Sequence, residues 1–466
     1  MIFLKNIISK ENHYREVLRV CLPLVLGLSA TTVMEFTDRV FLANYSIEAI
    51  SASLPAGITA YLFLAFFGGV GSYAGVFIAQ YSGKGDFKMI GSVLWQAIYF
   101  TLFAGILMYL VAVFATDAIF VLAGHEQEVQ RLEGIYFSIL CKGGILHVAI
   151  ATLSTFYIGR GFTRAVMIIT FLGVFVNIPL DYALIFGVWG MPEMGIRGAA
   201  IATVVAWVVN VVLFVVLIFT KKNNIKFQVL SQFQFNWKLL KRLMRFGVPA
   251  AFQFTMDILA FTLFVLLVGR IGTAELAATN IVLSINALTF MPSMGASQGI
   301  SILVGQALGK KSPLLAATYV RSGIHLLLTY TLIVDLIFIF APDFVLAPFF
   351  PATGPSTADP VVLEHARSLL KIVAVYLFCD VLYMVYTGAL RGAGDTRFMM
   401  IVATLAAPLC LVIPVYIGIE YFNISVTAAW GWILFFIGCL FLASWFRYRQ
   451  GKWKDMLVIE ESPLQD

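Results

Sequence analysis

The chain has 466 residues, of which 61% are hydrophobic and only 12% are charged, and its mean hydropathy is +0.92. A soluble globular protein has about 25% charged residues, so this composition excludes an ordinary soluble domain. The formal net charge of +6 is small for a chain of this length and gives no reason to expect nucleic-acid binding.

Apolar runs close to 20 residues long recur along the chain, and an α-helix of about that length crosses the hydrocarbon of a bilayer. Only helices and closed barrels can span lipid, and these runs are too long for barrel strands. We therefore predict an all-α integral membrane protein with twelve spans, at residues 19–42, 53–79, 91–115, 134–157, 166–187, 198–219, 244–269, 277–304, 318–341, 369–390, 398–419 and 425–446.

The five cysteines all fall inside these apolar runs and show no ligand spacing. Buried packing explains them better than disulfides or a metal centre. We expect no metal beyond a transported ion and no cofactor.

Basic residues gather in alternate connections between the spans. One set of connections holds Lys5, Lys10, Arg15, Arg19, Lys84, Lys88, Arg164, Lys310, Lys311, Arg397, Arg447, Arg449, Lys452 and Lys454, and the 220–245 connection adds seven more. The opposite set carries few beyond Arg39, Arg131, Arg197, Arg270, Arg367 and Lys371. The positive-inside rule then places both termini in the cytoplasm and the protein in the cell (inner) membrane.

The two halves of the chain resemble each other. The segment Arg19–Pro23 matches Arg245–Pro249 at an offset of 226, and Gln80, Gly83 and Lys84 match Gln306, Gly309 and Lys310 at the same offset. A third match, of residues 159–164 with 392–397, lies at an offset of 233. We predict a tandem parallel repeat of six spans, with a lobe at 1–220, a basic linker at 221–243, a lobe at 244–448 and a cytoplasmic tail at 449–466. In such transporters the binding sites lie near the midplane between repeats.

Within the linker, the portion Asn236–Arg242 has the pattern of an amphipathic helix. Two interpretations remain open for it: a solvated connecting helix, or a helix lying on the inner leaflet.

Acidic residues inside the spans need an explanation, because a charge at the centre of a span costs roughly 2.5–3.5 kcal/mol on insertion scales. Asp257 lies twelve residues after Arg245, and Asp380 lies eleven residues before Arg391. At 1.5 Å per residue both are about 16–18 Å from the cytoplasmic side, near the midplane. They can share one site, where two carboxylates repel unless a cation or proton joins them. The alternative is a polar clamp between helices.

A second group lies in the first half. Glu35 precedes Asp38 by one turn on the same face, and Asn177 and Asp181 are spaced i and i+4 on span 5. Carboxylates beside amide oxygens suit either Na⁺ or proton exchange. Asn and Asp also clamp helices, so the spacing alone leaves both roles open.

Span 4 carries Lys142 and His147, five residues apart and therefore about 140° apart around a continuous helix. The repeat maps Asp380 onto His147, so we predict that His147 faces the cavity. Lys142 is then expected to pair sideways with Asp38 or Asp181. Asp335 and His325, nearer the ends of span 9, are interpreted as structural.

Several motifs resemble those of the multidrug and toxic compound extrusion (MATE) transporters. They are Asn177–Tyr182, Gly195–Thr203, Gly247–Asp257, Val268–Asn280, Gly295–Gln298, Val304–Gly309 and Gly388–Arg397. The resemblance implies alternating access between two six-helix lobes. It also implies coupling acids at Asp38, Asp257 and Asp380, as in the NorM-like branch, and cation binding at Asp38, Asn177, Asp181 and Thr203, as in the DinF-like branch.

Three departures from the family pattern stand out: Asp257 occupies a position where Glu is usual, Asn44–Ser46 replaces a Gly-containing turn, and Ile158 and Phe162 replace an Arg and an Asp. Only the first bears on ion geometry. Candidate cavity residues are Glu35, His147, Gln253, Asn280 and Gln298.

The function expected from this resemblance is antiport, in which organic compounds, often cationic and aromatic, leave in exchange for Na⁺, H⁺ or both. A lipid-linked saccharide flippase of the same superfamily is the alternative, although it is expected to have a cationic cavity for diphosphate. No nucleophile–base set suggests an enzyme. The expected partners are small organic substrates and the lipid bilayer, and the chain is expected to act as a monomer.

Overall fold

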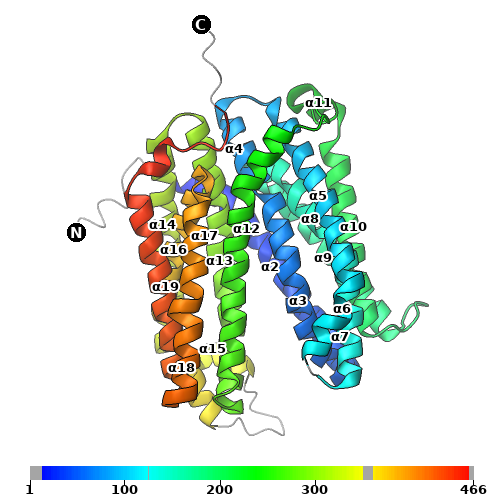
Figure 1. Ribbon diagram of the computed structural model, residues 1–466, viewed down its shortest axis with the longest axis vertical. Coiled ribbons are helices and arrows are strands. Elements are labelled where there is room, and N and C mark those ends of the chain that lie inside the picture. Colours follow the sequence, from blue (N-terminus) through cyan, green and yellow to red (C-terminus); the bar gives the residue numbers. More distant parts are fainter. Residues whose placement is uncertain (1–12, 124, 350–359, 461–466) are drawn as a thin grey trace. The chain divides into compact units, whose positions relative to one another are not determined.

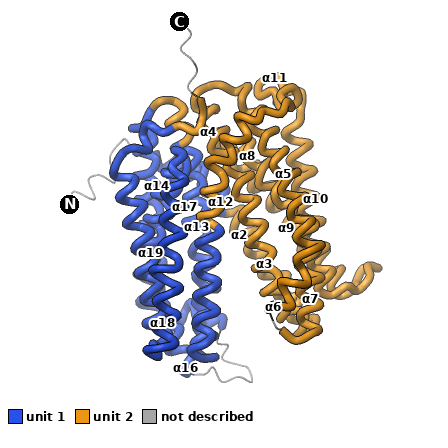
Figure 2. The backbone as a smooth tube through the Cα atoms, viewed as in Figure 1, with its two compact units in different colours: residues 1–25, 255–304, 312–456 blue, residues 26–254, 305–311, 457–466 orange. Residues whose placement is uncertain are grey.

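The computed structural model describes residues 13–123, 125–349 and 360–460, and every regular element among them is a helix (Figure 1). Lys5 and Lys10 of the predicted inner loops, and residues 461–466 of the predicted tail, lie outside the described residues. The described chain forms two compact units (Figure 2): unit 1 contains the described residues of 1–25, 255–304 and 312–456, and unit 2 contains those of 26–254, 305–311 and 457–466.

Unit 2 is built mainly from the helices of the first half. They are α2 (Tyr14–Tyr45), α3 (Ile47–Ser72), α4 (Ala74–Lys84), α5 (Met89–Phe114), α6 (Thr116–Ala123), α7 (Gln127–Lys142), α8 (Gly144–Ile158), α9 (Thr163–Phe186), α10 (Ile196–Ile218) and α11 (Lys221–Phe227). Helices α7 and α8 form one bent span, with 41° between them.

Unit 1 is built mainly from the second half. Its helices are α12 (Trp237–Val268), α13 (Thr273–Gly309), α14 (Pro313–Phe340), α15 (Pro342–Leu346), η1 (Ala347–Phe349), α16 (Pro360–Ala393), α17 (Thr396–Ala406), η2 (Ala407–Val412), α18 (Ile413–Phe422), α19 (Val426–Arg449) and η3 (Lys452–Asp455). Helix η2 is a π-helical turn that contains Pro408, which has no N–H to donate within the helix.

The twelve predicted spans are confirmed. Eleven described helices are long and apolar enough to cross a membrane, and the bent pair α7–α8 makes the twelfth. The helix boundaries extend beyond the apolar runs, because polar residues continue a helix outside the hydrocarbon. Thus α12 begins at Trp237, and the amphipathic pattern of the linker belongs to its first turns. The predicted helix is therefore present, but it is continuous with span 7, and the linker has a further helix of its own, α11. Whether its surface is solvated or lies at the inner leaflet stays a prediction.

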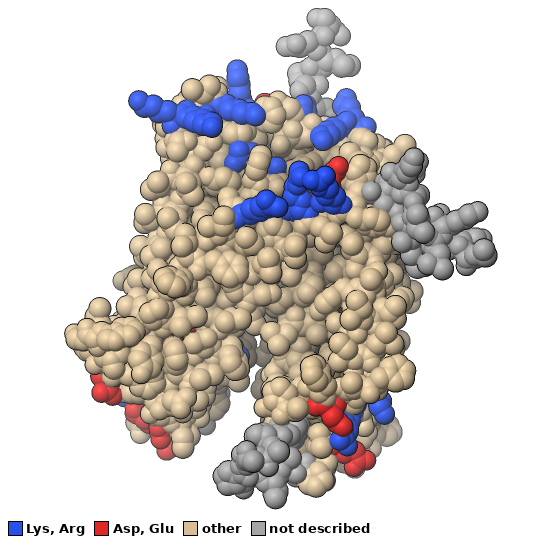
Figure 3. All heavy atoms as spheres, turned by 180° about the vertical axis from the view of Figure 1, so that it is seen from behind, with Lys and Arg blue, Asp and Glu red and all other residues tan. Residues whose placement is uncertain are grey.

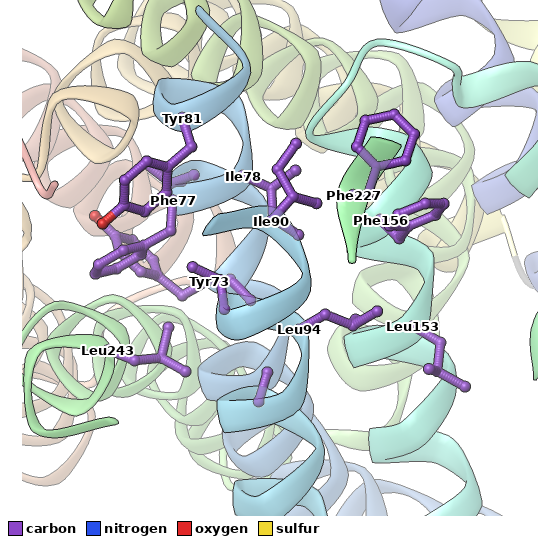
Figure 4. Packing of buried hydrophobic residues seen from close by; sticks show 14 of the residues in the cluster. Tyr73, Phe77, Ile78, Tyr81, Ile90, Leu94, Leu153, Phe156, Phe227 and Leu243 are labelled. Carbon is purple, nitrogen blue, oxygen red and sulfur yellow. The ribbon is translucent and has the colours of Figure 1, made fainter. Parts of the chain in front are cut away.

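The core of unit 2 contains a cluster of buried aromatic and aliphatic side chains (Figure 4). Phe77 of α4, Ile90 of α5 and Phe156 of α8 are 0% exposed. Phe227, the last residue of α11, is packed into the same cluster beside Phe156 (Figure 4). The linker is therefore attached to the helical core of unit 2 through an aromatic side chain.

Two glycines allow α4 to contact the end of α13 within unit 2. A Cβ atom added to Gly83 would lie 2.1 Å from the carbonyl oxygen of Gln306, and one added to Gly309 would lie 2.1 Å from that of Gln80. These four residues are the pairs that the internal repeat matches at an offset of 226. The contact is therefore reciprocal, and each position needs a residue without a side chain.

On the face drawn in Figure 3, charged side chains are largely absent from the surface around the middle of the helices. In Figure 3 the Lys and Arg side chains gather mainly near one end of the helices, and a broad uncharged surface covers the middle. This distribution fits helices whose central parts face hydrocarbon.

Candidate functional site

The structure brings two acids of the first half together. The carboxyl groups of Asp38 on α2 and Asp181 on α9 lie close enough to interact electrostatically. Asp181 is 0% exposed and Asp38 is 6% exposed. Neither oxygen of Asp181, nor Oδ1 of Asp38, has a hydrogen-bond partner among the described residues. A hydrogen bond between two carboxyl groups needs a proton, so the pair is incomplete without a proton or a cation.

Asn177 and Thr203, the other two residues predicted for this group, lie at nearby levels on α9 and α10. Asn177 precedes Asp181 by one helical turn on α9, is fully buried, and has no partner for its side-chain oxygen or nitrogen among the described residues. Two close approaches, Gly173 to Asn210 and Gly198 to Leu184, set the antiparallel register of α9 against α10. That register places Thr203 between the levels of Asn177 and Asp181.

The hydroxyl of Thr203 donates to the carbonyl of Ala199 at 3.1 Å, so its oxygen lone pairs stay available to an ion. The first-half group therefore offers buried carboxylate, amide and hydroxyl oxygens together. Buried polar atoms without a partner are rare in native proteins and cost free energy. An oxygen-rich site of this kind fits a hard cation such as Na⁺ or a bound proton.

Three further residues lie around this pair. Glu35 and Arg39, both on α2 with exposed side chains, interact electrostatically with Asp38. The Tyr136 hydroxyl on α7 is close enough to both Asp38 and Asp181 to interact with them electrostatically. Tyr136 was not predicted from the sequence, because a single tyrosine in an apolar span does not indicate which residues lie beside it.

The predicted pairing of Lys142 with Asp38 or Asp181 is wrong. Lys142 is the last residue of α7, its side chain is exposed, and the acids interact with one another instead. The prediction assumed one continuous helix through span 4, whereas the helix breaks at Gly143 and bends by 41°.

His147 lies beyond this break, on α8. Its ring packs edge-on against Trp207 of α10 with 5.2 Å between ring centroids. A Cβ atom on Gly68 of α3 would lie 3.6 Å from the His147 ring. Its predicted place in the transport cavity stays a prediction.

The second pair of acids lies within unit 1. Asp257 on α12 and Asp380 on α16 are close enough to interact electrostatically. The hydroxyl of Tyr383, one turn past Asp380, donates to Oδ2 of Asp257 at 3.1 Å. Asp380 is 4% exposed, and its Oδ2 has no hydrogen-bond partner among the described residues. The structure therefore places these two carboxylates together, as their equal depth predicted.

Polar and aromatic side chains surround this second pair. Tyr376 lies one turn before Asp380 and close to both Asp380 and Asn286 of α13, but its buried hydroxyl has no hydrogen-bond partner among the described residues. Its ring packs near Trp430, whose Nε1 donates to the hydroxyl of Thr279 at 3.1 Å. The sequence did contain a signal, because Tyr376, Asp380 and Tyr383 are spaced i, i+4 and i+7 and so share one face of α16.

The remaining candidates are distributed over both units. Gln253 is buried in unit 2, while Asn280 is exposed and Gln298 half-buried on α13 of unit 1. His325 was interpreted as structural. Its Nδ1 lies 2.9 Å from the hydroxyl oxygen of Tyr14 and links α14 to the start of α2. Asp335 is half-buried on α14.

Comparison with known proteins identifies relatives along nearly the whole chain. The sequence model of the MatE family matches residues 23–183 and 249–417. A probable multidrug resistance protein NorM of Thermotoga maritima is 28% identical over 99% of this chain and 98% of its own. A protein of the same description from Xylella fastidiosa is 27% identical over 84% of this chain and 82% of its own.

Solved structures share the fold. A MOP superfamily transporter from Pyrococcus furiosus, described as having a binding pocket of reverse polarity that suggests a different function, superposes with a TM-score of 0.85 at 21% identity. The match covers 96% of this chain and 97% of that one. An outward-facing multidrug resistance MATE family transporter of the MOP superfamily gives the same TM-score, identity and coverage.

Proposed function

The chain belongs to the MatE family, and from this premise we propose that it is a secondary active antiporter that exports small organic compounds in exchange for Na⁺, H⁺ or both. The two matched segments fall in the two halves of the internal repeat, which supports transport by alternating access of two lobes. The names of its relatives support multidrug efflux as the physiological activity.

The observation that carries the proposal is the Asp38–Asp181 pair. Two buried carboxylates without protein donors need a positive charge or a proton to be stable together. The pair of carboxylates therefore binds its ion strongly when the site is closed to water, and it releases the ion when water enters the site. Such a change in affinity is what couples an ion gradient to a conformational cycle.

Asp257 and Asp380 give unit 1 its own ion-binding pair. Over a full cycle, each cation or proton that enters moves one positive charge across the membrane, and the membrane potential contributes about 2.3 kcal/mol per charge per 100 mV. We propose that an ion arriving from outside neutralises the carboxylates and favours substrate release, and that substrate then enters from the cytoplasm or the inner leaflet. This cycle needs both termini on the cytoplasmic side of the inner membrane, as the basic loops indicate.

The substrate class follows from charge and from the aromatic rings near the acids. Buried carboxylates favour organic cations, and aromatic rings such as those of Tyr376 and Trp430 favour flat, apolar cations. A flippase for lipid-linked saccharides is less well supported, because it needs buried cations to hold a diphosphate and the buried pairs described above are acidic.

The test is efflux from proteoliposomes with Na⁺ and pH gradients imposed separately. Export of a fluorescent organic cation that rises with an inward Na⁺ or H⁺ gradient, and stops when that gradient is collapsed, is the expected result. An efflux rate that is the same with and without the Na⁺ gradient and the pH gradient would exclude antiport.

A further inference from the structure

The linker between the repeats is strongly basic and attached to one helix. Residues 219–245 contain seven Lys and Arg and no Asp or Glu. Lys221, Lys222 and Lys226 of α11 have exposed side chains, as do Lys238 and Lys241 at the start of α12. A surface of this charge attracts an anionic partner.

Hydrogen bonds attach the linker to the side of α5. The Nε1 of Trp95 donates to the carbonyl of Val229 at 2.7 Å. The Gln96 amide donates to the carbonyl of Gln234 at 3.0 Å and accepts from the backbone N–H of Asn236 at 2.9 Å. Tyr99 donates to the carbonyl of Phe233. Because α5 begins at Met89, these contacts reach about ten residues, or about 15 Å, along that helix.

The other end of the linker is held by a half-buried cation. The Arg160 guanidinium lies 3.7 Å from the centroid of the Phe156 ring and 4.4 Å from that of Phe227. Burial among these rings lowers the pKa of Arg160 to about 10, and the group stays charged at neutral pH. Figure 4 shows Phe227 directed toward Phe156 in the core of unit 2. The linker is thus a fixed surface held at both ends.

Large apolar side chains project from this fixed surface. Ile225 is 86% exposed, Phe233 and Phe235 are each 58% exposed, and Trp237 is 65% exposed. Phe235 stacks on Trp237 with 6.2 Å between centroids. Aromatic side chains beside lysines are typical of the boundary between lipid headgroups and acyl chains.

We propose that the linker surface, made of Lys221, Lys222, Lys226, Phe233, Phe235 and Trp237, binds an anionic phospholipid of the inner leaflet. The lysines contact the phosphate, and the aromatic rings contact the upper part of the acyl chains. This goes beyond the proposed antiport and needs no assumption about the coupling ion. A water-soluble polyanion would pair with the charges of the lysines but would leave the aromatic rings exposed to water. It would also not extend along the part of the linker that runs beside α5.

The experiment uses the full chain in detergent, titrated with phosphatidylglycerol or phosphatidylcholine and examined by native mass spectrometry. The native chain is expected to retain phosphatidylglycerol preferentially, and the preference is expected to fall in high salt. The variant Lys221→Gln/Lys222→Gln/Lys226→Gln is expected to bind phosphatidylglycerol at least about tenfold more weakly. The variant Phe233→Ser/Phe235→Ser is expected to lose retention of both lipids.

The matched control is Lys310→Gln/Lys311→Gln/Lys454→Gln, which removes three exposed lysines elsewhere. It should bind lipid as the native chain does. Equal retention in the two triple variants, or no headgroup preference in the native chain, would overturn the proposal. Displacement of the lipid by heparin at equal charge concentration would also overturn it, because it would show a site for soluble polyanions. If the first triple variant unfolds, the test is the salt dependence of phosphatidylglycerol retention by the native chain. A preference that does not fall in high salt would then overturn the proposal.

Discussion

The Tyr383 hydroxyl lies 3.1 Å from Oδ2 of Asp257 and links α16 to α12 within unit 1. Asp380, one turn earlier on α16, interacts with the same Asp257. In the proposed antiport cycle, the phenol occupies a position on Asp257 that the coupling ion also needs. In that cycle Tyr383 competes with the ion without carrying a charge of its own.

Tyr383→Phe removes this competition and keeps the ring. A hydrogen bond to a charged group contributes about 1.5–3 kcal/mol, so the coupling ion should reach half-maximal effect at about tenfold lower concentration. Ion titration of efflux in proteoliposomes measures the shift. Tyr386→Phe, which alters a ring packed on Tyr448 away from the acids, should leave the midpoint unchanged.

Asp257→Asn and Asp380→Asn should each abolish coupled efflux while leaving membrane insertion and monodispersity in detergent intact. Each substitution removes one of the two neighbouring carboxylates that the proposed cycle uses to bind an ion. Drug resistance of cells at matched expression is the measurement, and Asp335→Asn, outside either pair, is the control. Resistance close to that of the native chain in both pair variants would remove these acids from the mechanism.

Asp38→Asn or Asp181→Ala should weaken the dependence on cation, because Asp38, Asn177, Asp181 and Thr203 supply one oxygen-rich group. Tryptophan fluorescence of the purified protein during cation titration should show a shifted or absent midpoint. Asp181→Asn should also raise stability without cation by about 1–3 kcal/mol, since its amide can donate to Asp38. An unchanged midpoint in all these variants would mean that the pair is structural.

His147→Ala should change substrate range or the pH dependence of efflux more than folding. An imidazole changes charge near neutral pH when it is reached by water, and the ring packs on Trp207 rather than on a charged partner. Efflux of several dyes from pH 6 to 8 tests this, with His147→Gln as a neutral variant of similar size. Identical profiles for all three proteins would exclude a transport role for the ring.

Gly83→Ala and Gly309→Ala should each destabilise the protein by about 1–3 kcal/mol, because the added methyl group meets a backbone carbonyl that cannot rotate away. Thermal unfolding in detergent measures the loss. Gly438→Ala in α19 is the control, since nothing lies within 4 Å of its added Cβ. Equal melting temperatures in the three variants would show that the contact is loose.

The spans and the two groups of acids were predictable from the sequence for physical reasons. The thickness of hydrocarbon sets the length of an apolar run. The constant rise of a helix sets the depth of Asp257 and Asp380 once a basic residue marks the membrane surface. Neither quantity depends on knowing which helices are neighbours.

The predictions that failed depended on how each helix is rotated about its own axis and on which helices lie beside it. The relation between Lys142 and His147 assumed a continuous helix, and the bend at Gly143 removed its basis. Asn286 and Tyr136 were missed because α13 and α7 approach the acids through packing that no single span encodes. The start of α12 was misplaced because hydropathy marks where a helix meets lipid and not where it begins.

The reciprocal contact of Gly83 with Gln306 and of Gly309 with Gln80 has the form of an isologous interface, in which one surface meets a copy of itself. At this contact, two segments that the repeat matches meet each other in the same way from both sides. Two separately expressed halves, cut within the linker, are therefore expected to associate through a surface that both already carry.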